Sequence, residues 1–352
     1  MEKIIDPISL DLLEAELTPE RMFCRTNKGG NLIYIVDAHN APNVMQEIGR
    51  LREIAFREAG GSSGLAADID SFDTMEKPYK QIVVWDPEAK AILGGYRYIL
   101  GPDVALGSDG QPRLATAHMF HFSDFFIKEY LPHTMELGRS FVAPEYQSSK
   151  AGAKGLYALD NLWDAIAAVA GEHPGIIYLF GKMTTYPSYD HLCLDLIFHF
   201  LWKHFPDPEE LVRPYKPVMP ESNPRLLDLL LRDADFKSDY RNLKDAVRRL
   251  GANIPPLVNS YMQCSPSMKM MGSAVNDEFS DVIETAIMIC INEMYPEKLD
   301  RHRYPSFGSM VERIKGRFPR ISDESLQRIK DRRDSRKTAI FEKLKEKLNP
   351  GK

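Results

Sequence analysis

Glu136-Leu137-Gly138-Arg139-Ser140-Phe141-Val142 is the stretch of this sequence that decides the fold. Its second half is largely apolar and suits a β-strand, while its first half places a carboxylate and a guanidinium in the same strand. Charged side chains inside a central strand are costly unless they pair or take part in chemistry. We therefore predict that this strand is central to a sheet and carries a functional site.

Apolar runs on both sides of this strand alternate between strand and helix patterns. Short runs bounded by turn residues predict strands at 32–36, 81–85, 92–100, 176–180 and 286–291. Pro42 opens a helix that stops at Gly60, and the glycines at 152 and 155 lead into a second helix. The sequence thus predicts one mixed sheet flanked by helices, which is an α/β (α+β) fold.

Six charged residues before and within the central strand form a pattern that a known superfamily shares. They are Arg52, Asp70, Asp73, Arg97, Glu136 and Arg139. In this order, with Tyr178-Leu179-Phe180-Gly181 downstream, they resemble the acyl-homoserine lactone synthases and, more closely, the ornithine-lipid N-acyltransferases and their hemolysin-named relatives. Both groups are branches of the GNAT acyltransferase superfamily. The resemblance covers roughly residues 32–291 and includes Pro255-Pro256-Leu257, Tyr261 and the turn before Phe279.

This resemblance implies a GNAT fold, in which the central strand separates from its neighbour and points a backbone N–H at a thioester carbonyl. The separated strands would be those around Phe141-Val142 and Tyr178-Leu179-Phe180, so Phe141 and Val142 would lie beside the acyl donor. Acyl transfer to an amine needs a neutral nucleophile, a donor for the tetrahedral oxyanion and a proton for the departing thiol. It needs no covalent enzyme intermediate.

Glu136 is the first candidate for the base, acting directly or through a water. The alternative is a purely structural ion pair with Arg97 or Arg139. Asp70 and Asp73 can pair with the arginines at 52, 97 and 139, and by the resemblance such a network orders the acceptor side of the cleft. A turn that uses the aspartates for local backbone bonds is the alternative.

Tyr189 follows the strand that ends at Gly181, where GNAT enzymes often place a tyrosine that protonates the thiolate. Tyr186 and Tyr157 are other candidates for the same role. His118 and His121 are three residues apart without a convincing set of partner ligands, so we expect no metal.

The start of the second helix is the candidate site for the donor's pantetheine phosphate, because a helix N-terminus attracts anions. The residues concerned are Lys150, Gly152, Lys154 and Gly155. The superfamily pattern for coenzyme A is only approximated here, since Gln147 stands too far before Gly152. This favours an acyl carrier protein over coenzyme A as the donor, and a glycine-rich capped helix without a ligand is the alternative.

The composition is that of an ordinary globular chain, with 352 residues, 43% hydrophobic and 27% charged. We expect residues 1–300 to form a GNAT-like acyltransferase domain with a helical insertion at about 206–250, and residues 301–352 to form a basic helical tail. That tail holds 16 Lys or Arg against 7 Asp or Glu. It is either a solvated helix packed on the body or a docking segment for anionic lipid or an acidic carrier protein. We expect no nucleic-acid partner.

Four widely spaced cysteines and the absence of a signal-peptide pattern at the start favour free thiols in the cytoplasm, with peripheral contact to the inner face of the membrane left open. The function we expect is transfer of a fatty acyl group from acyl-ACP, or else acyl-CoA, to the amine of an amino acid such as ornithine or glycine, giving a lyso-aminolipid. One alternative is synthesis of an acyl-homoserine lactone signal. The other is a noncatalytic GNAT fold that binds a carrier protein or a membrane.

Overall fold

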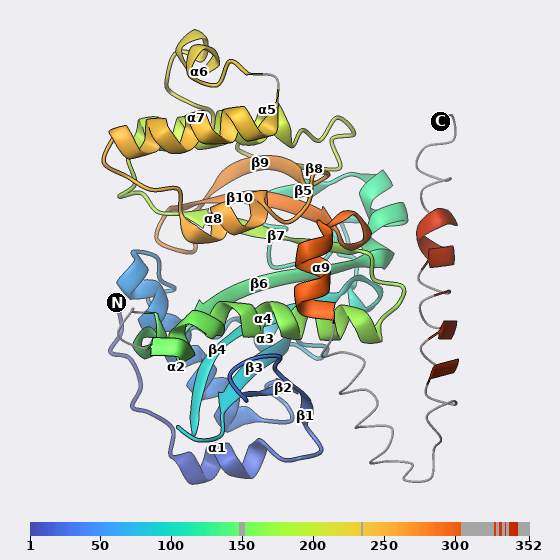
Figure 1. Cartoon of the computed structure of the whole chain (residues 1–352). Helices are drawn as coiled ribbons and strands as arrows, with labels where there is room; N and C mark the ends of the chain where they lie inside the picture. Colours follow the sequence, from blue (N-terminus) through green and yellow to red (C-terminus); the bar gives the residue numbers. More distant parts are fainter. Residues whose placement is uncertain are drawn as a thin grey trace.

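The computed structural model describes residues 1–147, 152–233, 235–303, 327–328, 331–332, 335 and 338–343, with backbone alone for 152–156 and 303. Its centre is an eight-stranded sheet in the order β1-β2-β3-β4-β6-β7-β10-β9, beside a small β5-β8 pair (Figure 1). All neighbours in the large sheet are antiparallel except β6 and β7, which are parallel. The sheet is therefore mixed, as predicted.

The described strands are β1 (Met22–Arg25), β2 (Leu32–Val36), β3 (Lys80–Asp86), β4 (Ala91–Leu100), β5 (Phe120–Phe122), β6 (Thr134–Val142), β7 (Tyr178–Thr185), β8 (Val212–Pro214), β9 (Lys269–Asn276) and β10 (Val282–Cys290). The described α-helices are α1 (Leu10–Glu16), α2 (Pro42–Ala59), α3 (Ser71–Thr74), α4 (Gly152–Glu172), α5 (His191–His204), α6 (Pro224–Leu230), α7 (Phe236–Arg249), α8 (Pro256–Met262) and α9 (Pro296–Arg303).

Helices cover both faces of the sheet because its strands are apolar on both faces. In β3, Ile82 and Val84 belong to the hydrophobic cluster on the side of α4, while Val83 and Trp85 belong to the cluster that includes α1 and α2. This alternation follows from the two-residue period of a strand. The segment around β5 covers the second face of β7 and β10, where Phe120, Phe122 and Phe126 are fully buried.

The predicted elements match the structure closely in the first half of the chain. Helix α2 starts at Pro42 and ends at Gly60, whose φ of 94° closes it in the left-handed conformation. The segment predicted as a helical insertion holds β8, α6 and α7. Helix α7 packs on α5, where Asp239 bonds both Lys203 and His204 at 2.6 and 2.9 Å. Strand β9 and the β5-β8 pair have no counterpart among the predicted elements.

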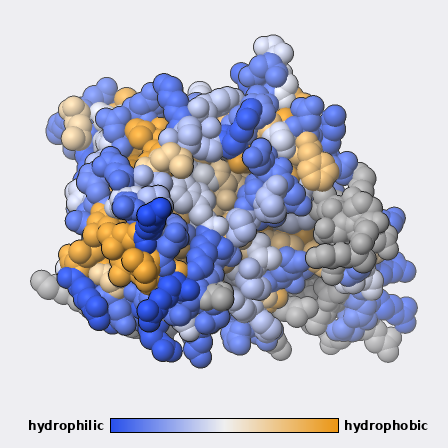
Figure 2. All heavy atoms as spheres, turned by 90° about the horizontal axis from the view of Figure 1, so that it is seen from above, coloured by the Kyte–Doolittle hydropathy of each residue, from blue (hydrophilic) through white to orange (hydrophobic). Residues whose placement is uncertain are grey.

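The surface is mainly hydrophilic on the face seen from above, where hydrophobic residues form separate patches (Figure 2). Helix α6 contributes exposed leucines, with Leu229 70% accessible. None of the helices in the described residues is both long enough and apolar enough to span a membrane. Most of the predicted basic tail lies outside the described residues, but 338–343 is helical, and Ile340 and Phe341 pack against the hydrophobic cluster that contains Phe120, Phe122 and Phe126.

Candidate active site

The sheet opens between β6 and β7. These strands pair only over Thr134–Glu136 and Tyr178–Phe180, although β6 runs on to Val142 and β7 to Thr185. On their outer sides β6 remains paired with β4, and β7 remains paired with β10. The predicted separation of the two central strands is therefore present. Tyr178–Phe180 marks its closed end, and the opening lies beyond it.

A β-bulge in β6 lies beside this opening. Gly95 pairs with Phe141 and Arg97 with Gly138, so two residues of β6 stand opposite one residue of β4. One of the two, Arg139, has a φ of 48°, which is uncommon for a residue with a side chain. Beyond Glu136, the backbone groups of β6 that point away from β4 have no strand partner in the described residues. The strand thus presents backbone donors and the Arg139 side chain at one place.

Two glycines let β4 approach its two neighbours, β6 at Gly94 and β3 at Gly95. A Cβ on Gly94 would lie 2.5 Å from the carbonyl oxygen of Phe141, and a Cβ on Gly95 would lie 2.6 Å from that of Ile82. Both distances are below van der Waals contact, so a side chain at either position would push the strands apart. This explains the glycine pair before Tyr96 and Arg97 in the sequence.

A cavity of about 370 Å³ fills the opening. Its walls come from β6, β7 and β10, from Trp163 of α4, and from Pro255 and the start of α8. The lining is mostly apolar. The hydroxyls of Tyr96 and Tyr261 meet there at 2.9 Å. The Pro255-Pro256-Leu257 segment and Tyr261, which served only as family markers in the sequence, therefore form part of the cavity wall.

A second cavity, about 210 Å³, is polar and adjoins the first. It is lined by Asp68, Asp70, Arg97, His118, Asn276 and Glu278, among others. Arg139, Lys182 and Phe279 line both cavities. The polar and apolar spaces therefore meet at these three side chains.

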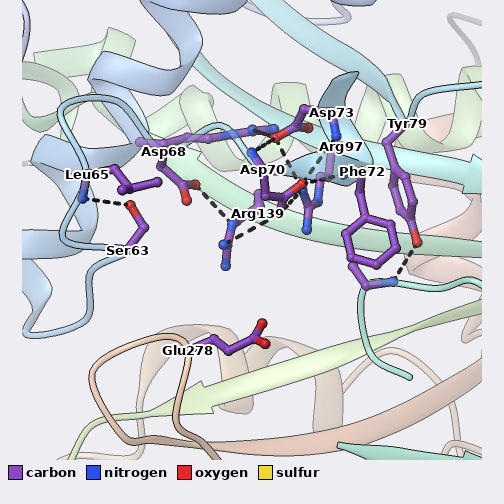
Figure 3. Close-up of polar contacts among 12 residues, drawn as sticks. Ser63, Leu65, Asp68, Asp70, Phe72, Asp73, Tyr79, Arg97, Arg139 and Glu278 are labelled. Carbon is purple, nitrogen blue, oxygen red and sulfur yellow. Dashed lines mark hydrogen bonds and ion pairs between the residues drawn. The ribbon is translucent and has the colours of Figure 1, made fainter. Parts of the chain in front are cut away.

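Aspartates from the loop after α2 hold the arginines of the sheet (Figure 3). Arg97 Nη1 lies 2.7 Å from Asp70 Oδ2 and 3.3 Å from Asp73 Oδ2. Arg52 Nη1 lies 3.4 Å from the same Asp73 oxygen. Burial opposes the ionisation of Asp73, but Arg97 and Arg52 outweigh it, and the pKa of this carboxyl is lowered.

The aspartates form local backbone hydrogen bonds and ion pairs with arginines at the same time. The Asp70 side chain accepts from the backbone N–H of Phe72 and of Asp73, while Asp73 accepts from the N–H of Asp70. This is a reciprocal cap on α3, and it leaves other carboxylate lone pairs for the arginines. The turn therefore fixes the carboxylates that hold Arg52 and Arg97.

Arg139 is held less tightly. Its Nε lies 2.9 Å from Asp68 Oδ2, yet neither atom has a partner with hydrogen-bond geometry in the described residues. The guanidinium stands 4.5 Å from the ring centre of Phe279. Figure 3 shows Glu278, in the turn between β9 and β10, facing Arg139 from the other side of the polar cavity. Arg139 thus offers N–H groups to a ligand at the junction of the cavities.

Glu136 does not line either cavity. Its side chain is buried and accepts hydrogen bonds from the hydroxyls of Tyr79 and Thr116, the latter at 2.7 Å. Burial raises the pKa of Glu136. No ion pair with Arg97 or Arg139 forms in the described residues. The predicted alternative of an ion pair is therefore not formed among the described residues, and both oxygens of Glu136 accept from hydroxyl groups instead.

The remaining predicted residues lie at the edges of the site or outside it. The Tyr189 hydroxyl donates to the carbonyl oxygen of Asn253 at 2.6 Å, away from both cavities, and burial raises the pKa of Tyr189 to about 12. Phe141 packs in the core with α2, and neither Phe141 nor Val142 lines the cavity.

Of the donor-site residues, Gly152, Lys154 and Gly155 lie in the first turn of α4, and Lys150 lies outside the described residues. The start of α4 follows the predicted boundary, but the structure describes none of the side chains there.

The sequence reasoning missed Lys182 and Glu284. Lys182 Nζ lies 2.7 Å from Glu284 Oε1, and Thr184 donates to Glu284 Oε2 at 2.8 Å. Both residues lie just outside the predicted strands at 176–180 and 286–291, because β7 runs on to Thr185 and β10 starts at Val282. The reasoning applied to Glu136 and Arg139, which concerns charges within a strand, therefore did not reach them.

Several known proteins resemble this chain. Residues 51–156 match the family model described as an acetyltransferase (GNAT) domain. The chain is 58% identical over 302 residues to a glycine N(alpha)-acyltransferase of Bacteroides thetaiotaomicron, covering 86% of this chain and 90% of that protein. It is 56% identical over 302 residues to the protein of the same name from Phocaeicola vulgatus, covering 86% and 93%. The solved structure of FeeM, an N-acyl amino acid synthase from uncultured soil microbes, is similar at 11% identity with a TM-score of 0.38, covering 75% of this chain and 93% of the other.

Proposed function

This chain belongs to the glycine N(alpha)-acyltransferases, which makes it an amino-acid N-acyltransferase with a GNAT domain, and from this premise we propose that it transfers a fatty acyl group from an acyl carrier protein to glycine. The product is an N-acylglycine, the lyso form of a glycine lipid. The observation that carries the proposal is the meeting of an apolar and a polar cavity at Arg139 and Lys182, between strands that have separated.

The polar cavity suits the acceptor. Glycine carries a carboxylate and an ammonium, and Arg139 presents a guanidinium whose N–H groups are not taken up by hydrogen bonds in the described residues. A guanidinium binds a carboxylate through two parallel hydrogen bonds. Asp68 beside it holds the arginine in place, while the buried pairs of Arg97 with Asp70 and Asp73 brace the floor of the cavity.

The apolar cavity suits the donor. An acyl chain and the pantetheine arm are long and largely uncharged, and the walls around Trp163, Pro255 and Leu257 are apolar. The thioester carbonyl would lie against the bulge of β6, where unpaired backbone N–H groups can stabilise the oxyanion. The amine attacks from the side of Arg139, because that residue lines both cavities.

A carrier protein is the donor that the sequence favours. The glycine spacing at the start of α4 departs from the coenzyme A pattern, and Lys154 lies in the first turn of that helix, four residues after Lys150, the other lysine predicted to contact the phosphate. A carrier protein presents the same arm with fewer phosphates. Cytoplasmic location, with the basic tail at the inner face of the membrane, is part of the same proposal.

Purified protein mixed with acyl-ACP or acyl-CoA, and with glycine, ornithine or S-adenosylmethionine, tests the proposal. Mass spectrometry should find N-acylglycine, with acyl-ACP giving the higher kcat/KM. A preference for ornithine, or a lactone from S-adenosylmethionine, would refute the acceptor. An equal or higher kcat/KM with acyl-CoA would refute the proposal that a carrier protein is the donor, without affecting the proposal that glycine is the acceptor.

A further inference from the structure

A buried ion pair joins Lys182, at the junction of the two cavities, to Glu284, which lines the apolar cavity. We infer that Glu284 is the catalytic base that accepts the proton of the acceptor amine, and that Lys182 is the residue that positions it. The inference deepens the proposed function and rests on it.

The pair is built by neighbouring strands. Glu284 of β10 stands opposite Thr184 of β7, so Lys182, two residues earlier, shares the same face of the sheet. Lys182 Nζ lies 2.7 Å from Oε1, the Thr184 hydroxyl donates to Oε2 at 2.8 Å, and Asn276 Nδ2 reaches Oε1 at 3.4 Å. A carboxylate has about four lone-pair sites. Three donors therefore leave room for one N–H from a ligand.

Glu284 is the one carboxylate among the described residues that line the apolar cavity. The other carboxylates near the reacting atoms are engaged or turned away. Asp68 and Asp70 pair with arginines, and Glu136 is occupied by two hydroxyls. Glu278 lies at the polar cavity with its side chain 74% exposed. A base that meets an amine beside the thioester must lie close to the junction, and Glu284 lines the apolar cavity 2.7 Å from the Lys182 ammonium at that junction.

The charges that face the pair come from every element around it. From β6 and β4, Arg139 and Arg97 act on Lys182, and both favour its neutral form. Tyr186, after β7, also lines the apolar cavity and feels the charge of Glu284. On the side of the polar cavity, His118 Nε2 lies 3.3 Å from Asn276 Oδ1 and 3.8 Å from Glu278 Oε2.

These surroundings keep Glu284 ionised. Burial opposes its ionisation, but the charge of Lys182 and the hydrogen bonds of Lys182, Thr184 and Asn276 outweigh it, so the pKa of Glu284 is lowered. For Lys182, burial lowers the pKa and Glu284 only partly restores it. An ionised carboxylate can hold the ammonium of the acceptor before the transfer and accept a proton from it during the transfer.

Glu284 takes one proton from the acceptor ammonium and passes it to solvent. The nitrogen lone pair then forms the C–N bond at the thioester carbon, and the oxyanion develops against the bulge of β6. Collapse of this intermediate breaks the C–S bond, and the second nitrogen proton ends on the departing thiolate sulfur. The reaction releases an amide, a thiol and one proton, without oxidant or cofactor.

Two variants and one matched control test the inference with acyl-ACP and glycine. Glu284→Gln keeps the shape of the side chain but cannot accept the proton, so kcat should fall by about 10²–10⁴-fold while KM for acyl-ACP stays within about threefold. Lys182→Met removes the cation that keeps Glu284 ionised, so the acid limb of the kcat–pH profile should move to higher pH. Lys203→Met is the control, since it breaks a similar pair with Asp239 away from both cavities, and its profile should match the wild type.

Thermal unfolding of each variant separates loss of fold from loss of chemistry. A folded Glu284→Gln enzyme within about fivefold of the wild-type kcat would overturn the inference. If that variant does not fold, a folded Lys182→Met enzyme whose acid limb stays at the wild-type pH would overturn it. A wild-type enzyme that makes no N-acylglycine would instead refute the proposed function, so the two failures are distinguishable.

Discussion

Replacing Asp73 by asparagine removes the carboxylate that Arg52 and Arg97 share in the floor of the polar cavity. Arg97 keeps Asp70 at 2.7 Å, but Arg52 is fully buried and keeps only an amide partner, Gln81. Breaking a buried ion pair by removing one partner costs about 3–5 kcal/mol, because the remaining charge stays buried without a counter-ion. We therefore expect Asp73→Asn to lower the free energy of unfolding by about that amount.

Urea unfolding at neutral pH measures this loss, with Asp70→Asn as the matched control. Asparagine still caps α3, and Arg97 retains Asp73, so the control should lose at most about 1.5 kcal/mol. The pKa of Asp73 is lowered in the folded state, so its contribution is complete above the unfolded pKa of about 3.9 and is lost as the pH falls through the folded value. The gap between wild type and Asp73→Asn should therefore narrow on acidification. A loss below about 1 kcal/mol at neutral pH, or a gap that widens in acid, would refute the reasoning.

Three further substitutions separate the roles of the predicted site residues. Glu136→Gln should have the same kcat–pH profile as the wild type, because the Glu136 side chain does not line either cavity. If the acid limb of the profile disappeared in this variant, Glu136 would be the catalytic base. Arg139→Lys should raise KM for glycine about 10–100-fold and leave KM for acyl-ACP unchanged, because an ammonium cannot form the bidentate contact with a carboxylate. Steady-state kinetics measures both constants, and an unchanged KM for glycine would show that Arg139 does not bind the acceptor. Tyr189→Phe should keep the wild-type kcat and lose about 1 kcal/mol of stability, because its hydroxyl bonds Asn253; a large fall in kcat without unfolding would contradict this placement.

The sequence was sufficient for the architecture around β6. Strand and helix periods, the glycine at the end of α2 and the charges at 136 and 139 are local signals, and local signals survive without a structure. The separation of β6 and β7 was expected only from the family resemblance. The separation of these strands comes from the bulge at Arg139. A single sequence gives no sign of a bulge other than the bulged residue itself.

The direction in which each side chain of the site points could not be predicted from the sequence. Whether Glu136 faces the cavity depends on Tyr79 and Thr116, which lie 57 and 20 residues away along the chain. The pairing of Lys182 with Glu284 joins strands 102 residues apart in sequence, so no local pattern connects them. Such contacts are set by strand order and register, which become known only with the fold.

The claim that a thioester meets an amine in the opening between β6 and β7 is tested most directly by a crystal structure with bound N-acylglycine. We expect the amide to lie beside the bulge and the glycine carboxylate to bind Arg139. The acyl chain should contact Trp163 and the α8 segment, and Glu284 should lie within hydrogen-bond distance of the amide nitrogen. A product bound elsewhere, or in this opening with its carboxylate turned away from Arg139, would contradict it.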